Sequence, residues 1–193
     1  NKIDVIDLSN PAKPTLITSI DMAVYNGAAN SVATFNGKLA VALESKSNKQ
    51  DAGKVVVFET SNYALVKEIT VGALPDMITY SHDGKFILTA NEGEPNDDYS
   101  QDPDGSVSII DVASNYAVTT LNFTGFSGQL ASLKTKGFRI ASVTNNFAAD
   151  IEPEYITISA DSKTAWVTLQ ENNGVAKIDL TTKKTTELFH LGY

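Results

Sequence analysis

The stretch "DMITYSHDGKFILTANE" at residues 76–92 decides the fold of this chain. Two runs rich in β-branched and aromatic residues flank the turn sequence "HDGK", and this order predicts a strand, a tight turn and a second strand. Aspartate and glycine tolerate the backbone conformations that a short hairpin needs. The same order occurs in "NSVATFNGKLAVALE" (30–44) and in "EYITISADSKTAWVTLQE" (154–171), where Ser162 replaces the turn glycine. The sequence therefore predicts the same β-hairpin three times.

Each predicted hairpin is followed by two further strand-like runs. The first run is short and mostly β-branched, in "VVVFET" (55–60), "VSIIDV" (107–112) and "VAKIDL" (175–180). A polar turn separates it from the second run, in "LVKEITV" (65–71), "VTTLNF" (118–123) and "TTELFHL" (185–191). The same pair opens the chain without a hairpin before it, as "IDVIDL" (3–8) and "TLITSI" (15–20). The chain is thus predicted to contain three four-strand units and half of an earlier one.

The repeats cover about 30–71, 76–123 and 154–191, with an insertion at about 124–152. A four-strand unit that recurs every 40–50 residues or so, about one blade length, is typical of β-propellers, whose blades bury their faces against one another. We therefore predict an all-β fold: a partial β-propeller ring of about three four-stranded antiparallel blades plus half of another, in one domain over residues 1–193. A β-sandwich is the alternative. Propellers have about 4–8 blades, so we expect the rest of the ring or another chain to complete this one.

Charge and composition exclude several classes of protein. The net charge of −8 argues against a nucleic-acid partner, because phosphate binding requires a basic face. The lack of cysteine excludes disulfides and thiolate metal sites. No apolar run approaches the roughly 20 residues that span a bilayer, and no basic and apolar leader follows Asn1. Because the chain starts inside a strand-like run, we expect a piece of a longer protein whose signal and anchor lie outside it.

Antiparallel geometry places the acidic segments on one face. In a propeller blade, the loop between the second and third strands lies at the same end as the crossover to the next blade. The acidic loop 91–105 and the end of the insertion, 148–155, are therefore expected at this end. Carboxylate and carbonyl oxygens are the ligands that calcium prefers. The candidate metal ligands are therefore Glu92, Glu94, Asp150, Glu152 and Glu154, and the further candidates on this face are Asp76, Glu171 and Arg139.

A solvated loop is the alternative for part of this acidic run. Asp102 and Asp104 belong to "SQDPDG" (100–105), which fits an EF-hand calcium loop poorly because a strand rather than a helix follows it. Proline and glycine shape such a turn without any ion. We therefore expect Asp97 to Asp104 to face solvent, which leaves Glu92 and Glu94 as the better ligands of this loop.

Several motifs resemble a known family. The run "PDMITYSHDGKFILTANE", with "GSVSIIDVAS" after it, is similar to the YVTN-type repeat of bacterial surface propellers. The segments "ANEGEPNDDYSQDPDGSVSIIDV", "GFRIAS" and "DIEPEYITISADSKTAWVTLQENNGVAKIDL" resemble the choice-of-anchor I family, over most of residues 27–182. That family includes mesenchyme-specific cell-surface glycoproteins and atypical alkaline-phosphatase-like proteins of bacteria. The resemblance implies a secreted or surface-anchored propeller, and it transfers no set of catalytic residues.

Three functions are open at this point. The first is an extracellular or cell-surface binding or scaffold module with Ca²⁺ on its acidic face, and with another protein or a surface polymer as partner. The second is a calcium-dependent phosphatase, in which Arg139 binds either a phosphate oxygen or a local carboxylate. The third is a structural segment of a surface layer. A two-zinc phosphatase is disfavoured because His82 and His190 are the only histidines, and we expect both to be structural.

Overall fold

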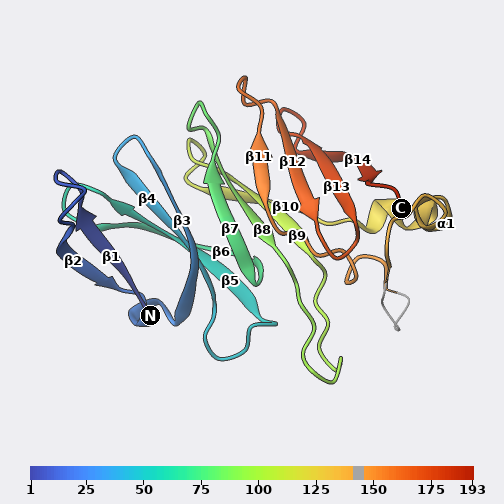
Figure 1. The fold of residues 1–193 in the computed structure, drawn as a ribbon, viewed down its shortest axis with the longest axis horizontal. Helices are drawn as coiled ribbons and strands as arrows, with labels where there is room; N and C mark the ends of the chain where they lie inside the picture. Colours follow the sequence, from blue (N-terminus) through green and yellow to red (C-terminus); the bar gives the residue numbers. More distant parts are fainter. Residues whose placement is uncertain (141–145) are drawn as a thin grey trace.

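The computed structural model describes residues 1–140 and 146–193 (Figure 1). Its strands form three four-stranded sheets, here called blades 1 to 3, which lie side by side in a row. A two-stranded half-blade stands at the N-terminal end of this row. The half-blade consists of β1 (Lys2–Asp7) and β2 (Thr15–Asp21), and η1 (Ala23–Tyr25) links it to blade 1. Blade 1 consists of β3 (Gly27–Phe35), β4 (Lys38–Ser45), β5 (Ala52–Glu59) and β6 (Leu65–Ala73). Blade 2 consists of β7 (Pro75–Tyr80), β8 (Phe86–Asn91), β9 (Ser106–Asp111) and β10 (Ala117–Leu121). Blade 3 consists of β11 (Ile156–Ile158), β12 (Thr164–Leu169), β13 (Gly174–Asp179) and β14 (Lys184–His190).

The strands of each blade follow one another in chain order, and all neighbouring pairs are antiparallel. The predicted fold class, an all-β row of about three four-stranded blades and half of another, is confirmed. A β-bulge falls at the same place in three of the outer strand pairs, between Val5 and Ile6, between Val57 and Phe58, and between Lys177 and Ile178. The shared bulge makes Ile6, Phe58 and Ile178 structurally equivalent.

The hairpin turns of blades 2 and 3 require left-handed backbone. Gly84 has a φ of +70°, and a Cβ at this position would lie 2.1 Å from the Phe35 ring of blade 1. Glycine alone meets both demands. Ser162 takes the equivalent position in blade 3 with a φ of +58°. Its hydroxyl accepts a 3.1 Å hydrogen bond from the backbone amide of Asp83, which ties this turn to blade 2 and offsets part of its strain.

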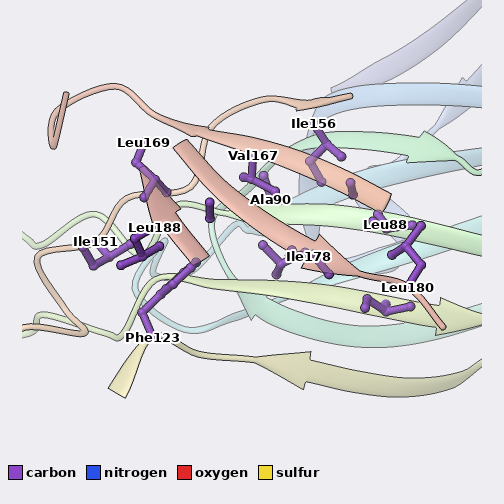
Figure 2. Packing of buried hydrophobic residues seen from close by; sticks show 14 of the residues in the cluster. Leu88, Ala90, Phe123, Ile151, Ile156, Val167, Leu169, Ile178, Leu180 and Leu188 are labelled. Carbon is purple, nitrogen blue, oxygen red and sulfur yellow. The ribbon is translucent and has the colours of Figure 1, made fainter. Parts of the chain in front are cut away.

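Apolar layers between neighbouring blades form the core. Figure 2 shows the layer between blades 2 and 3, in which Leu88 and Ala90 of β8 share one cluster with Val167 of β12 and Ile178 of β13. All four side chains are fully buried. Burying one large aliphatic side chain contributes roughly 1.5–3 kcal/mol, so each layer holds its two blades together. The loops at the blade ends are thus carried by a rigid scaffold.

The insertion between blades 2 and 3 begins with two short helices, η2 (Thr124–Gln129) and α1 (Leu130–Lys134). Its residues Phe138 and Ile151 are buried in the layer between these blades, which fixes the end of the insertion beside their loops. Residues 141–145, which include the end of the "GFRIAS" motif, lie outside the described residues. Among the described residues, no helix has the length and apolar character needed to cross a membrane.

Candidate functional site

The two ends of the blades differ in shape (Figure 1). The hairpin turns lie at one end, and the long loop of residues 92–105 extends from the other. At this loop end, a pocket of about 360 Å³ lies between the long loop, the end of the insertion and the turn after β12. Its walls are formed by Glu92, Glu94, Pro95, Tyr99, Asp102, Ala149, Asp150, Glu152, Glu171 and Asn172. Six of these side chains are carboxylates, and we call this feature the acidic pocket.

A close backbone crossing fixes the long loop against the insertion. A Cβ added at Gly105 would lie 1.7 Å from the carbonyl oxygen of Ile151. The amide of Gly105 also donates a 3.3 Å hydrogen bond to the carbonyl of Ala148. Only glycine permits this approach of two backbones. The crossing therefore brings Asp102 from the loop and Asp150 from the insertion to one pocket.

A buried asparagine positions the opposite wall. Asn172 is 2% exposed, and its Oδ1 accepts a 3.2 Å hydrogen bond from the backbone amide of Glu152. Its Nδ2 donates to the carbonyl of Arg139, at 3.1 Å, and to the carbonyl of Asp150. Asn172 thus holds the backbone that carries Asp150 and Glu152. Its role could not be predicted from the sequence, because the doublet of Asn172 and Asn173 indicates only a turn.

Glu92 is a half-buried carboxyl group beside Asp76. Burial, then a hydrogen bond with Asp76 and the negative charges of Asp76 and Glu154, raise the pKa of Glu92 to about 9. At neutral pH the Glu92 carboxyl is therefore protonated, and it donates the hydrogen bond that joins it to Asp76. Asn30 Nδ2 donates a 3.0 Å hydrogen bond to Asp76 Oδ1 and so helps to hold this acceptor in place.

The other carboxylates of the pocket repel one another. Burial, followed by the charges of Glu171 and Asp150, raises the pKa of Glu152 to about 7. Burial, followed by the charge of Glu171, also raises the pKa of Glu154. Burial is the main reason why the pKa of Asp102 is raised. Such shifts indicate a site with too little positive charge for its carboxyl groups to ionise freely.

Lys49 is the basic side chain that approaches these carboxylates most directly. Its Nζ lies 2.5 Å from Glu94 Oε2, and both side chains are nearly half exposed, so the pair is weak. Arg139 is exposed and contacts the pocket wall through its backbone bonds to Asn172. Its guanidinium forms no ion pair with any described residue. Within the described parts of the chain, no group of three or more His, Asp or Glu side chains is arranged to hold a metal ion as it stands.

The structure brings most of the predicted site residues together. The predicted residues that line the pocket are Glu92, Glu94, Asp150, Glu152 and Glu171. Asp76 and Glu154 lie beside them as the electrostatic neighbours of Glu92. The expectation that Asp102 faces solvent is wrong, because the loop folds back at Gly105 and half-buries this side chain in the pocket wall. Metal binding by these residues stays a prediction.

Neither histidine lines the acidic pocket. His82 is in the hairpin turn of blade 2, at the opposite end, and its Nε2 is 3.1 Å from the carbonyl oxygen of Ile158 in blade 3. His190 ends β14, the outer strand of blade 3. The bond from His82 to Ile158 links two blades, as a structural residue does. The pocket walls thus combine carboxylates with an asparagine and a tyrosine, and the described residues place no histidine among them.

Solved structures share this architecture. Hydrazine synthase from Kuenenia stuttgartiensis matches with a TM-score of 0.65 and 14% identity, over 100% of this chain and 57% of that chain. A functionally unknown protein from Desulfotomaculum acetoxidans matches with a TM-score of 0.60 and 9% identity, over 98% of this chain and 49% of that one. A nidogen/laminin complex matches with a TM-score of 0.55 and 14% identity, over 98% and 55%. These identities show the fold alone, and this chain spans about half the length of the three solved chains.

The family comparison covers the whole molecule. The family model of the choice-of-anchor I domain matches residues 1–193, from the half-blade to the end of blade 3. No curated protein matches the chain. The match includes the acidic loop, the insertion and all three blades. The chain therefore belongs to the choice-of-anchor I family.

Proposed function

We propose that the chain is a binding module of a cell-surface protein and that its acidic pocket takes Ca²⁺. The family supports the surface location, and loops carried on rigid blades are common binding sites. The observation that carries the calcium assignment is the gathering of six carboxylates around one pocket of about 360 Å³. The basic group that approaches them, Lys49, is held by a weak exposed ion pair that a divalent cation can displace.

Calcium suits the chemistry of this pocket. It accepts about six to eight oxygen ligands in irregular geometry, including carboxylates, carbonyls and water. The carboxylates come from the long loop, the insertion and the turn after β12, and they do not surround one point as they stand. Calcium binding therefore has to draw these side chains together. Its attraction for them offsets the repulsion that raises the pKa of Glu152.

Calcium binding is expected to release protons. At pH 7 the carboxyl of Glu92, with a pKa of about 9, is protonated, and that of Glu152, with a pKa of about 7, is half protonated. A carboxyl group binds metal in its deprotonated form. Calcium affinity should therefore increase as the pH rises from about 6 to about 8. Calorimetric titrations in two buffers of different ionisation enthalpy measure the protons released.

The decisive experiment is a calcium titration followed by thermal unfolding and calorimetry. Calcium should raise the melting temperature of the chain, because an ion that binds only the folded state stabilises it. The variant Glu152→Gln should bind more weakly, whereas Glu187→Gln is the matched control on an exposed part of β14. Magnesium is the second ion to test, since it tolerates irregular geometry less well. Unchanged melting and no heat at millimolar calcium would refute the calcium assignment.

A further inference from the structure

The loop between β4 and β5 (46–51), here called the blade 1 loop, lies against the long loop of blade 2. Both loops extend from the loop end of the blades (Figure 1). Asn48 Nδ2 donates a 2.9 Å hydrogen bond to Gln101 Oε1. Gln50 Nε2 donates a 3.1 Å hydrogen bond to the backbone carbonyl of Glu94. Two neutral side chains of the blade 1 loop therefore join it to the long loop.

The blade 1 loop is also held in shape by its own hydrogen bonds. The amide of Asp51 donates a 3.0 Å bond to the carbonyl of Asn48, which closes a four-residue turn. Asn48 Nδ2 donates a 3.2 Å bond to Asp51 Oδ1, and the amide of Gln50 donates a 3.4 Å bond to Asn48 Oδ1. Lys49 is the second residue of this turn, so its backbone has a fixed place beside the long loop.

From this turn, Lys49 places a cation at the edge of the acidic pocket. Its Nζ is 2.5 Å from Glu94 Oε2, and Glu94 lines the pocket. After Glu94, the negative charge of Glu44 adds to the attraction on the ammonium group. The carboxylate of Glu94 therefore already binds a cation, and the chain itself supplies it. This is an observation separate from the gathering of carboxylates around the pocket.

We propose that Lys49 is a tethered competitor of Ca²⁺ at Glu94 and so sets the calcium affinity and the ion selectivity of the acidic pocket. This inference rests on the calcium binding proposed above. A calcium ion can use the Glu94 carboxylate only after the ammonium group has left it. A monovalent ion carries no more charge than that group, which the loop keeps at high effective concentration. A divalent ion is attracted about twice as strongly, so the exchange favours Ca²⁺.

The exchange leaves the other contacts between the two loops in place. Asn48 and Gln50 bind the long loop through the side chain of Gln101 and a backbone carbonyl, and neither of these acceptors is a carboxylate. The side chain of Lys49 is nearly half exposed, so it can turn into solvent without disturbing buried residues. Calcium binding therefore frees the Lys49 amine while the blade 1 loop stays joined to the long loop.

Calorimetric calcium titrations of charge-matched variants test this competition. Lys49→Gln should lower the dissociation constant for Ca²⁺ about three- to tenfold, because the ion no longer has to break an ion pair or approach an ammonium group. Lys46→Gln is the matched control, since Lys46 is exposed in the same loop and forms no ion pair with any described residue. Both variants lose one positive charge, so their difference measures the contact at Glu94. Lys49→Arg keeps a competing cation and should bind Ca²⁺ about as the wild type does.

Amine labelling followed by mass spectrometry gives a readout that does not depend on affinity alone. At constant pH, added calcium should raise the labelling rate of Lys49 several-fold, because the amine loses its carboxylate partner. The rise should have the same midpoint as the calorimetric titration. Lys46 in the same sample is the internal control, and its labelling should not change.

The outcomes separate this inference from the calcium assignment on which it rests. If the wild-type chain binds calcium and Lys49→Gln binds it no more tightly than Lys46→Gln, the competition is refuted and the calcium assignment stands. The same conclusion follows if calcium binds without changing the labelling of Lys49. If neither the wild-type chain nor Lys49→Gln binds calcium, the calcium assignment and the competition are both refuted.

Discussion

The hairpin end and the loop end of the blades both carry carboxylates, but their electrostatic states are opposite. At the hairpin end, a hydrogen bond from Lys85 is the main reason why the pKa of Asp83 is lowered to about 2, and Lys183 lowers the pKa of Asp111. At the loop end, burial and neighbouring carboxylates raise the pKa of Glu152 to about 7. The turn carboxylates have their partners within the chain and stabilise the fold. The raised pKa values of Glu92 and Glu152 indicate that repulsion between carboxylates is strong at the loop end, and a bound cation would relieve it.

Part of the pairing at the hairpin end is local in the sequence, whereas the carboxylates of the loop end meet only in the folded structure. In the turn "HDGK", the aspartate and the lysine that neutralises it are two residues apart, so the turn sequence contains both partners. The acidic pocket draws its carboxylates from the long loop, the insertion and the turn after β12. At the hairpin end, this local pair and the longer-range pair of Asp111 with Lys183 match each carboxylate with a lysine, whereas the convergence of distant loops gathers carboxylates at the loop end.

The largest effect is expected from Gly105→Ala, which breaks the crossing on which the loop end depends. The new Cβ would lie 1.7 Å from the carbonyl oxygen of Ile151, so one of the two backbones has to move. We expect a loss of about 3 kcal/mol in the free energy of unfolding, measured by urea denaturation. The control is Gly125→Ala, since a Cβ there meets no atom within 4 Å. If the two variants were equally stable, the close approach of the Gly105 and Ile151 backbones would be contradicted.

A smaller loss is expected from Asn172→Ala. The change leaves the carbonyls of Arg139 and Asp150 and the amide of Glu152 without their side-chain partner, at a cost of about 2 kcal/mol. It should also weaken calcium binding, because two pocket carboxylates lose their fixed backbone. Urea denaturation and calorimetry measure the two effects. Asn62→Ala, which removes one exposed turn hydrogen bond, is the control and should leave calcium binding unchanged.

The sequence predicted the blades better than the site, for a physical reason. A strand repeat is encoded locally, so the turns at Gly84 and Ser162 and the β-branched runs were enough to place the sheets. Glu92 could be placed because it directly follows a strand. Asp102 and Asn172 could not, because their burial depends on the crossing at Gly105 and on the path of the insertion. The hydrophobic periodicity of a sequence contains no information on contacts between two loops. Turn sequences also have the same composition whether their residues are buried or exposed to solvent.

The pH dependence of stability tests the repulsion between carboxylates at the loop end. The folded pKa of Glu152, about 7, lies above its ordinary value of 4.5, so the folded state holds this proton more tightly than the unfolded state does. Stability therefore falls as the pH rises from about 4.5 through about 7, and it stays lower above that range. Glu152→Gln removes the charge and should stabilise the chain by about 1 kcal/mol at pH 8, after allowing for solvent screening, and by little at pH 4 or so. Thermal unfolding at both pH values measures this, with Glu187→Gln as the control.

The smallest effect, of opposite sign, is expected at the hairpin end. The pKa of Asp83 is lowered from 3.8 to about 2, so its carboxylate contributes stability above about pH 3.8, and this contribution is lost as the pH falls toward about 2. Asp83→Asn should therefore destabilise the chain at pH 7, by about 0.5 kcal/mol because the group is exposed, and should have almost no effect near about pH 2. Thermal unfolding at the two pH values measures the difference. If Asp83→Asn instead stabilised the chain at pH 7, the carboxylates of the hairpin end would be repulsive like those of the pocket, and the contrast between the two ends would be lost.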